Sequence, residues 1–184
     1  TFFVCGNHEI RGFYSAALPS LLDQPGGKTY GAFSWGDTRF VILDCGEDKP
    51  DDQPVYYGLN DFSVFRQQQY DFLKEEKKSR DFKSANRRVL VNHIPLWGND
   101  DKYQPSSELW TPLLKEGSFD IGLSGHTHRF RYHPAEDVSN PFPICIGGAP
   151  NVSSATMMVL SKKGNSLSLR VLNAKGEELG AWSL

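Results

Sequence analysis

The chain has 184 residues, the size of one domain, and folding at this length buries roughly 70% of the unfolded surface. It carries 20 basic and 22 acidic residues, for a formal charge of −2, with no basic run longer than Lys77-Lys78 or Lys162-Lys163. This balance does not indicate a surface for nucleic acid or anionic membranes, and the short apolar runs predict no membrane span, which needs roughly 20 residues.

The first third of the chain predicts mainly strands and a long loop. Residues 1–5 form an apolar run that predicts a buried strand, and residues 11–22 predict a short helical or irregular segment broken by Pro19. Residues 30–35 and 39–44 predict a β-hairpin with Asp37 in its turn. Residues 47–60 contain two prolines and four acidic residues, so we expect a solvated loop of the kind that often carries function.

The middle of the chain predicts two helices and two strands. Residues 61–80 place Phe65, Phe72 and Leu73 on one helical face, with Asp61 as N-cap. The apolar residues 89–91 predict a short strand, then residues 97–107 a polar loop and residues 107–115 a second helix. Residues 119–123 predict another strand.

The last third predicts strands without helices. Residues 144–146, 157–160, 167–172 and 179–184 are short apolar segments separated by glycine-containing turns, as in an antiparallel meander. In the first part of the chain the predicted strands alternate with helices, and in the last third they follow one another directly. This order is typical of a layered α/β sandwich with two packed sheets.

Four of the five histidines lie in three short islands that each follow an apolar run: Gly6-Asn7-His8-Glu9, Asn92-His93-Ile94-Pro95 and Gly125-His126-Thr127-His128. Ligands spread over about 120 residues do not fit a local structural zinc site, whose Cys and His pairs are closely spaced. A site gathered from distant strand ends is more typical of catalysis. The fifth histidine, His133, lies outside the islands and is interpreted as a surface or packing residue.

Side chains of these types suit a transition-metal ion. Asn7, His93 and His126 supply one amide oxygen and two imidazole nitrogens, which Zn, Mn and Fe accept. His126 and His128 are one residue apart, so in extended backbone both side chains point to the same side, and two neighbouring ions can each take one histidine.

In order, the islands resemble the third, fourth and fifth motifs of the calcineurin-like metallophosphoesterases, a superfamily that includes purple acid phosphatases: G-N-H-[DE], a histidine closing a strand, and G-H-x-H. The resemblance covers residues 3–133 and implies an α/β fold, part of the family's four-layer α/β/β/α sandwich with mixed sheets. An H-x-H pair also begins the H-x-H-x-D-H signature of metallo-β-lactamases, but residues 129–131 are Arg-Phe-Arg, and this alternative fails.

The resemblance also implies roles for the motif residues. Asn7, His93 and His126 would bind the second ion of a dinuclear centre and His128 the first, the ions being divalent or trivalent Mn, Fe or Zn. His8 would point at a phosphoester substrate as the catalytic residue, with Glu9 orienting it. Two such ions, roughly 3.5–4 Å apart, lower the pKa of a bridging water and stabilise the entering and leaving oxygens of an in-line phosphoryl displacement.

The family's first two motifs, D-x-H and G-D-x-x-D, do not occur in the sequence; after Gly36-Asp37, Phe40 stands where the second Asp is required. We therefore expect residues 1–184 to be the C-terminal part of one catalytic domain, inactive alone and binding at most one ion. The alternative is a non-catalytic metal-binding or interaction module that retains the fold. We also expect self-association through an exposed sheet edge. The strand-rich tail resembles that of exported members of the family.

Overall fold

The computed structural model describes residues 2–22, 24–100, 102–148 and 150–184. Within them, strands form a six-stranded sheet of order β1-β2-β3-β4-β6-β5 and a three-stranded sheet of order β7-β8-β9. The bounds are β1 Gly31–Trp35, β2 Thr38–Ile42, β3 Arg87–Val91, β4 Ile121–Ser124, β5 Arg131–His133, β6 Ile144–Ile146, β7 Thr156–Lys163, β8 Ser166–Asn173 and β9 Glu178–Ser183.

Four strands in the middle of the large sheet, β2, β3, β4 and β6, run parallel. Their register aligns Ile42 with Val91, Val91 with Leu123 and Leu123 with Cys145. Because parallel strands end at the same edge, the segments that follow β2, β3 and β4 emerge side by side. This edge positions the candidate site.

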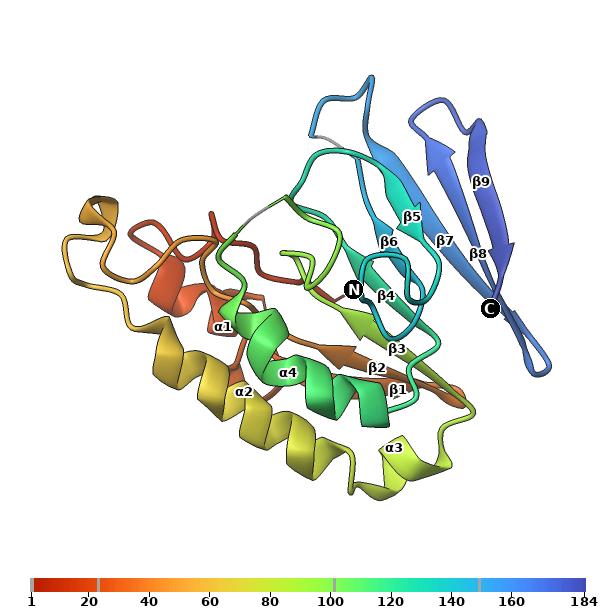
Figure 1. Cartoon of the computed structure of the whole chain (residues 1–184), viewed down its shortest axis with the longest axis horizontal. Coiled ribbons are helices and arrows are strands. Elements are labelled where there is room, and N and C mark those ends of the chain that lie inside the picture. Colours follow the sequence, from red (N-terminus) through yellow and green to blue (C-terminus); the bar gives the residue numbers. More distant parts are fainter. Residues whose placement is uncertain (1, 23, 101, 149) are drawn as a thin grey trace.

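Helices α2 (Phe62–Glu76) and α4 (Pro105–Glu116) cover one face of the large sheet (Figure 1). Their core residues Leu73, Trp110 and Leu114 are completely buried and pack in one cluster with Val41 and Leu90 of the sheet. Fully burying each of these side chains stabilises the fold by about 1.5–3 kcal/mol. The helices therefore hold the parallel strands, and with them the strand ends, in fixed positions.

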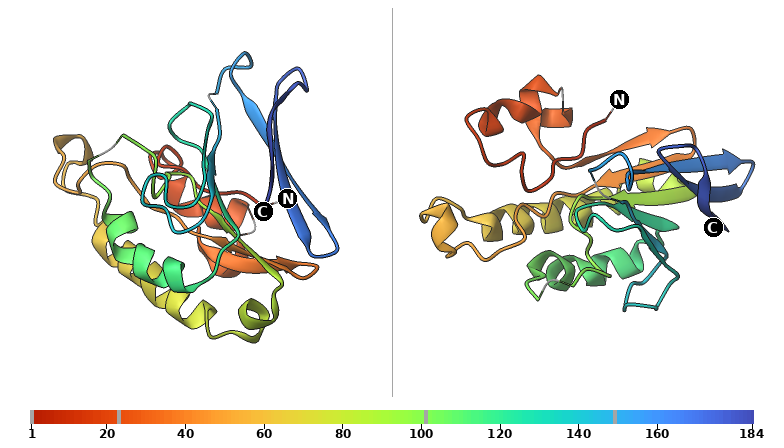
Figure 2. Two further views of the ribbon diagram at one scale, coloured as in Figure 1. Left: turned by 45° about the vertical axis from the view of Figure 1, so that its right-hand side comes forward. Right: turned by 90° about the horizontal axis from the view of Figure 1, so that it is seen from above.

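The small sheet packs on the other face of the large sheet, as the left panel of Figure 2 shows. Val89, Ile121 and Cys145 of the large sheet contact Leu169 and Val171 of β8 in a second core cluster. Among the described residues, no long helix covers the outer face of the small sheet. The predicted α/β sandwich with two packed sheets is confirmed, with its layers in the order helices, large sheet, small sheet.

Most elements predicted from the sequence are present, with shifted ends. The hairpin of β1 and β2 turns at Gly36 and Asp37 as predicted. The helix predicted over residues 61–80 ends at Glu76 and is followed by the separate α3 (Arg80–Ser84). Asp61 occupies the N-cap position of α2 as predicted, but its side chain makes no capping bond to the helix backbone; its carboxylate accepts a hydrogen bond from the Ser63 hydroxyl at 2.6 Å.

Other predicted elements are wrong. Residues 2–5 form no regular strand, and Phe2 and Phe3 are about half exposed; Thr1 lies outside the described residues. β6 is parallel to β4 in the large sheet rather than part of the antiparallel meander, and the short β5 was not predicted. The short helical segment predicted over residues 11–22 is present as a 3-10 turn at Ser15–Ala17 and α1 (Leu18–Leu21), but Pro19 lies in the first turn of α1 and does not break it. Further 3-10 turns lie at Pro25–Gly27 and Pro54–Tyr56. No described helix has the length and apolarity to cross a membrane.

Candidate metal centre

The loops after β3 and β4 are joined at the carboxyl edge of the large sheet. The Asn92 amide donates to the Leu123 carbonyl at 3.1 Å, and the Gly125 amide donates to the His93 carbonyl at 3.0 Å. These bonds extend the strand pairing beyond the regular ladder and bring two imidazoles together. The ring centroids of His93 and His126 lie 5.3 Å apart, edge to face.

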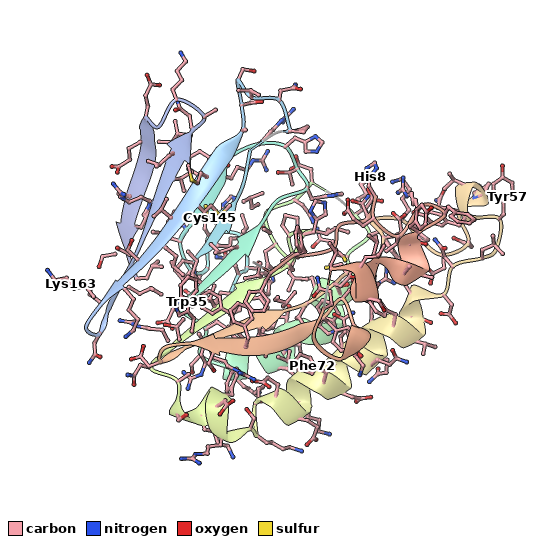
Figure 3. All side chains as sticks on the ribbon, turned by 180° about the vertical axis from the view of Figure 1, so that it is seen from behind. His8, Trp35, Tyr57, Phe72, Cys145 and Lys163 are labelled. Carbon is pink, nitrogen blue, oxygen red and sulfur yellow. The ribbon has the colours of Figure 1, made fainter. Side chains whose placement is uncertain are left out.

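A cavity of about 420 Å³ opens between these loops and the segment that follows Cys5. Every site residue predicted from the sequence lines it, together with three that were not predicted. The lining residues are Asn7, His8, Glu9, Arg11, Asp48, Lys49, His93, His126 and His128. Figure 3 shows His8 on the side of the molecule that also carries Tyr57, away from Lys163 at the tip of the β7–β8 hairpin.

Asn7 is the most deeply buried of the predicted ligands, with 3% of its surface exposed. Its side-chain oxygen is inaccessible and accepts no hydrogen bond. A buried amide oxygen without a partner costs about 1–3 kcal/mol, and such an atom is commonly satisfied by an ion or a water molecule. An oxygen of this kind facing a cavity lined by histidines fits a transition-metal ligand.

The surroundings of the His93 ring favour its neutral form. Burial lowers the pKa of His93, and the neighbouring His126 lowers it further, while Glu9 opposes the shift. Neutral imidazole is the form that coordinates a metal ion, because a ring nitrogen must carry a free lone pair. His93 therefore suits the ligand role that the sequence predicted.

The backbone of the Gly125–His128 turn differs from the extended conformation expected. His126 has φ of 68° and His128 has φ of 58°, and the Thr127 amide donates to the Gly125 carbonyl at 2.8 Å. The left-handed region costs roughly 1–2 kcal/mol for a residue with a Cβ. The two histidines therefore share one cavity through a strained turn, not through strand alternation, and strain of this kind clusters at functional sites.

The turn after Asn7 is fixed by Glu9. Its carboxylate accepts a hydrogen bond from the Gly6 amide at 2.7 Å. Both His8 and Glu9 are exposed at the cavity, so His8 is open to a substrate. The hydrogen-bond donor to Glu9 is the backbone amide of Gly6. That Glu9 also orients the His8 ring stays a prediction.

Sequence reasoning missed Arg11, Asp48 and Lys49. Arg11 binds Glu47 through two bonds of 2.5 and 2.6 Å, and the Glu47 side chain is completely buried. Burial alone would raise the pKa of Asp48, but Lys49 and His126 hold it below its usual value. The only signal in the sequence was the acidic, proline-containing loop after the second hairpin strand.

The side chains of Asn7, His93 and His126 offer one amide oxygen and two imidazole nitrogens, a donor set that fits one transition-metal ion. Among the residues the structure describes, no three His, Cys, Asp and Glu side chains are placed together as ligands. The candidate set therefore depends on Asn7, whose orphaned oxygen is the feature of the structure that a cation would satisfy.

A family model described as calcineurin-like phosphoesterase matches residues 1–130, which include all three histidine islands. No curated protein matches the chain in sequence.

Solved structures with a similar fold include two phosphatases. Purple acid phosphatase PPD1 from yellow lupin is 15% identical with a TM-score of 0.65, covering 98% of this chain and 39% of that one. A dimetal phosphatase from Danio rerio is 14% identical with a TM-score of 0.66, covering 99% and 71%. GAP50, described as the anchor in the inner membrane complex of Plasmodium, is 16% identical with a TM-score of 0.50, covering 84% and 52%. The chain thus spans well under half of the lupin protein.

Proposed function

The chain belongs to the calcineurin-like phosphoesterase family, and we propose that it contributes part of a dinuclear metal centre that hydrolyses phosphoesters. The observation that carries the proposal is the buried, unpartnered oxygen of Asn7 facing a cavity with His93 and His126.

In this proposal Asn7, His93 and His126 hold one ion, and His128 contributes to a second. Mn, Fe and Zn all accept this mixture of nitrogen and oxygen donors. When bound, the ions would supply positive charge against the phosphoryl oxygens and lower the pKa of water at the site.

His8 is proposed as the catalytic residue. Its side chain is exposed where it lines the cavity, directly after the proposed ligand Asn7. An imidazole there can hold a proton and deliver it to the leaving alkoxide, a role worth roughly 10²–10⁴-fold in rate. The Gly6–Glu9 hydrogen bond keeps the turn that carries His8 in shape.

We further propose that residues 1–184 are the C-terminal part of one catalytic domain. The supporting facts are that no D-x-H or G-D-x-x-D motif occurs in the sequence and that the chain spans 39% of the lupin phosphatase. The remaining ligands of the first ion and the bridging carboxylate would then come from residues outside this sequence. The chain alone would bind at most one ion and lack activity.

The alternative, a non-catalytic module that retains the fold, has one observation in its favour. The structure of a protein described as an anchor in a Plasmodium membrane complex has a TM-score of 0.50 with this chain. A module of this kind, whether it binds metal or a partner, needs no catalytic activity, so hydrolysis separates the two proposals.

The test is hydrolysis of p-nitrophenyl phosphate and bis-p-nitrophenyl phosphate with Mn²⁺, Fe³⁺ or Zn²⁺ supplied. It is run on the chain and on the longest natural polypeptide that contains it, each with His8→Ala and His93→Ala variants. We expect hydrolysis by the longer polypeptide, about 10²–10⁴-fold slower in His8→Ala. Absent hydrolysis in the longer polypeptide would favour the non-catalytic module, and hydrolysis that does not depend on metal would contradict the proposed metal centre.

A further inference from the structure

Asp48 lines the cavity of the candidate centre, but the proposed function assigns it no part in metal binding or catalysis. Its side chain is 18% exposed, and its Oδ2 is 3.7 Å from Nε2 of His126. Its other oxygen, Oδ1, is 2.6 Å from the Lys49 ammonium. One carboxylate oxygen is therefore held by a cation, and the second faces the ring nitrogen of a proposed ligand.

We propose that Asp48 is a positioning residue for His126, which rests on the function proposed above. Its carboxylate accepts a hydrogen bond from the Nε2–H of His126, so the ring presents Nδ1 to the ion. A metal-binding imidazole commonly donates its other N–H to a carboxylate, which fixes the tautomer and strengthens the ligand. The present distance must shorten by about 0.5–1 Å to reach a hydrogen bond.

The loop that carries Asp48 is anchored on both sides. The buried Glu47 carboxylate binds Arg11, which ties the loop to the turn that carries Asn7. On the other side, Arg66 of α2 donates to the Cys45 carbonyl at 3.1 Å and to the Glu47 carbonyl at 3.2 Å. The Asp48 backbone is thus fixed between the metal-site turn and a packed helix, as a residue that orients another side chain must be.

The competing geometry makes Asp48 a ligand itself. An ion between Oδ2 and Nε2 would take both atoms directly, so Nε2, not Nδ1, would be the coordinating nitrogen of His126. The two arrangements therefore differ in one observable atom.

The experiment uses ¹⁵N-labelled chain titrated with Zn²⁺. Two-bond ¹H–¹⁵N spectra of the loaded chain report which nitrogen of His126 carries the proton. Zn²⁺ affinity is measured by calorimetry for wild type, Asp48→Asn and Asp48→Ala. Asp52→Ala is the matched control, since Asp52 is an exposed acid of the same loop that does not line the cavity.

We expect a protonated Nε2 and a Zn²⁺-bound Nδ1 on His126, with affinity 10–100-fold weaker in Asp48→Ala and unchanged in Asp52→Ala. We expect Asp48→Asn to retain part of the affinity, because its amide oxygen still accepts a hydrogen bond. Thermal unfolding of Asp48→Ala shows whether its weaker affinity belongs to a folded chain. Zn²⁺ on Nε2, or equal affinity in wild type and Asp48→Ala, overturns this inference alone. A wild-type chain that binds no Zn²⁺ overturns the proposed function together with it.

Discussion

Substituting Gly6 by Ala tests whether the turn before Asn7 is packed against the candidate centre. A Cβ on Gly6 would lie 2.8 Å from Oε2 of Glu9 and 2.9 Å from both Cδ2 and Nε2 of His93. Gly6 does not have a left-handed φ, so an alanine there is opposed by packing alone. The Glu9 oxygen cannot simply retreat, because it accepts the Gly6 amide hydrogen bond at 2.7 Å.

The magnitude follows from these overlaps. Each contact must lengthen by about 0.5 Å or more to reach ordinary van der Waals separation. Overpacking of this size costs about 1–3 kcal/mol, which lowers Tm by roughly 2–12 °C in a chain of this length. Because His93 is one of the displaced groups, we also expect Zn²⁺ affinity to fall about tenfold or more, as loss of ligand positioning does.

Gly125→Ala is the matched control on the other side of the same imidazole. There a Cβ would lie 3.8 Å from Nδ1 of His93, an ordinary contact, and the Gly125 amide that bonds His93 is retained. Thermal unfolding and Zn²⁺ calorimetry are measured for both variants. The reasoning is refuted if Gly6→Ala matches wild type, or if the two variants lose stability and affinity equally.

Three further perturbations test individual contacts of the fold, one beside the site and two away from it. Glu47→Gln should lower the free energy of unfolding by about 1–3 kcal/mol in urea titrations, less than the full cost of breaking a buried pair because Arg11 is 40% exposed. Lys162→Ala should destabilise the chain at neutral pH, because the hydrogen bond from Lys162 to ionised Asp37 is lost; that bond holds the pKa of Asp37 below 3.8. The destabilisation should shrink as pH falls below 3.8, since protonation of Asp37 removes the contribution of the bond in the wild type too. Chemical unfolding from pH 7 to pH 3 measures this. Self-association through the β1 edge should be weakened by Trp35→Lys, since Trp35 is 79% exposed there, and a strict monomer in wild-type light scattering contradicts it.

Two controls separate these effects from general loss of charge. Glu75→Gln removes an acid from the exposed ion pair with Lys78 and should leave the free energy of unfolding nearly unchanged. Lys163→Ala removes an exposed cation next to Lys162 and should leave the pH dependence unchanged. Effects equal to those of Glu47→Gln or Lys162→Ala would contradict the assigned contacts.

Local pattern predicted the elements whose signal is contained in their own residues. The hairpin, α2 and α4 followed from turn chemistry and helical spacing, and each is present. Residues 2–5 carry the same kind of apolar run as β3 but form no strand, because a strand also needs a paired neighbour that composition does not reveal. The parallel pairing of β6 with β4 failed for the same reason.

The sequence predicted which residues line the candidate site better than it predicted their backbone conformation. Motif spacing identified the histidines and Asn7, all of which line one cavity. The left-handed backbone of His126 was not predicted, since a turn conformation there depends on the contact of Gly125 with His93. Asp48 reaches the cavity only because Arg11 and Glu47 tie two distant loops together, a tertiary effect with no local signature.

The central claim is that Asn7, His93 and His126 hold an ion, and elemental analysis tests it most directly. The chain is incubated with Zn²⁺ or Mn²⁺, desalted and analysed beside its Asn7→Ala and His93→Ala variants. The account predicts one retained ion per wild-type chain and a loss of that ion in both variants. An ion-free wild-type chain, or an undiminished ion in both variants, would contradict it.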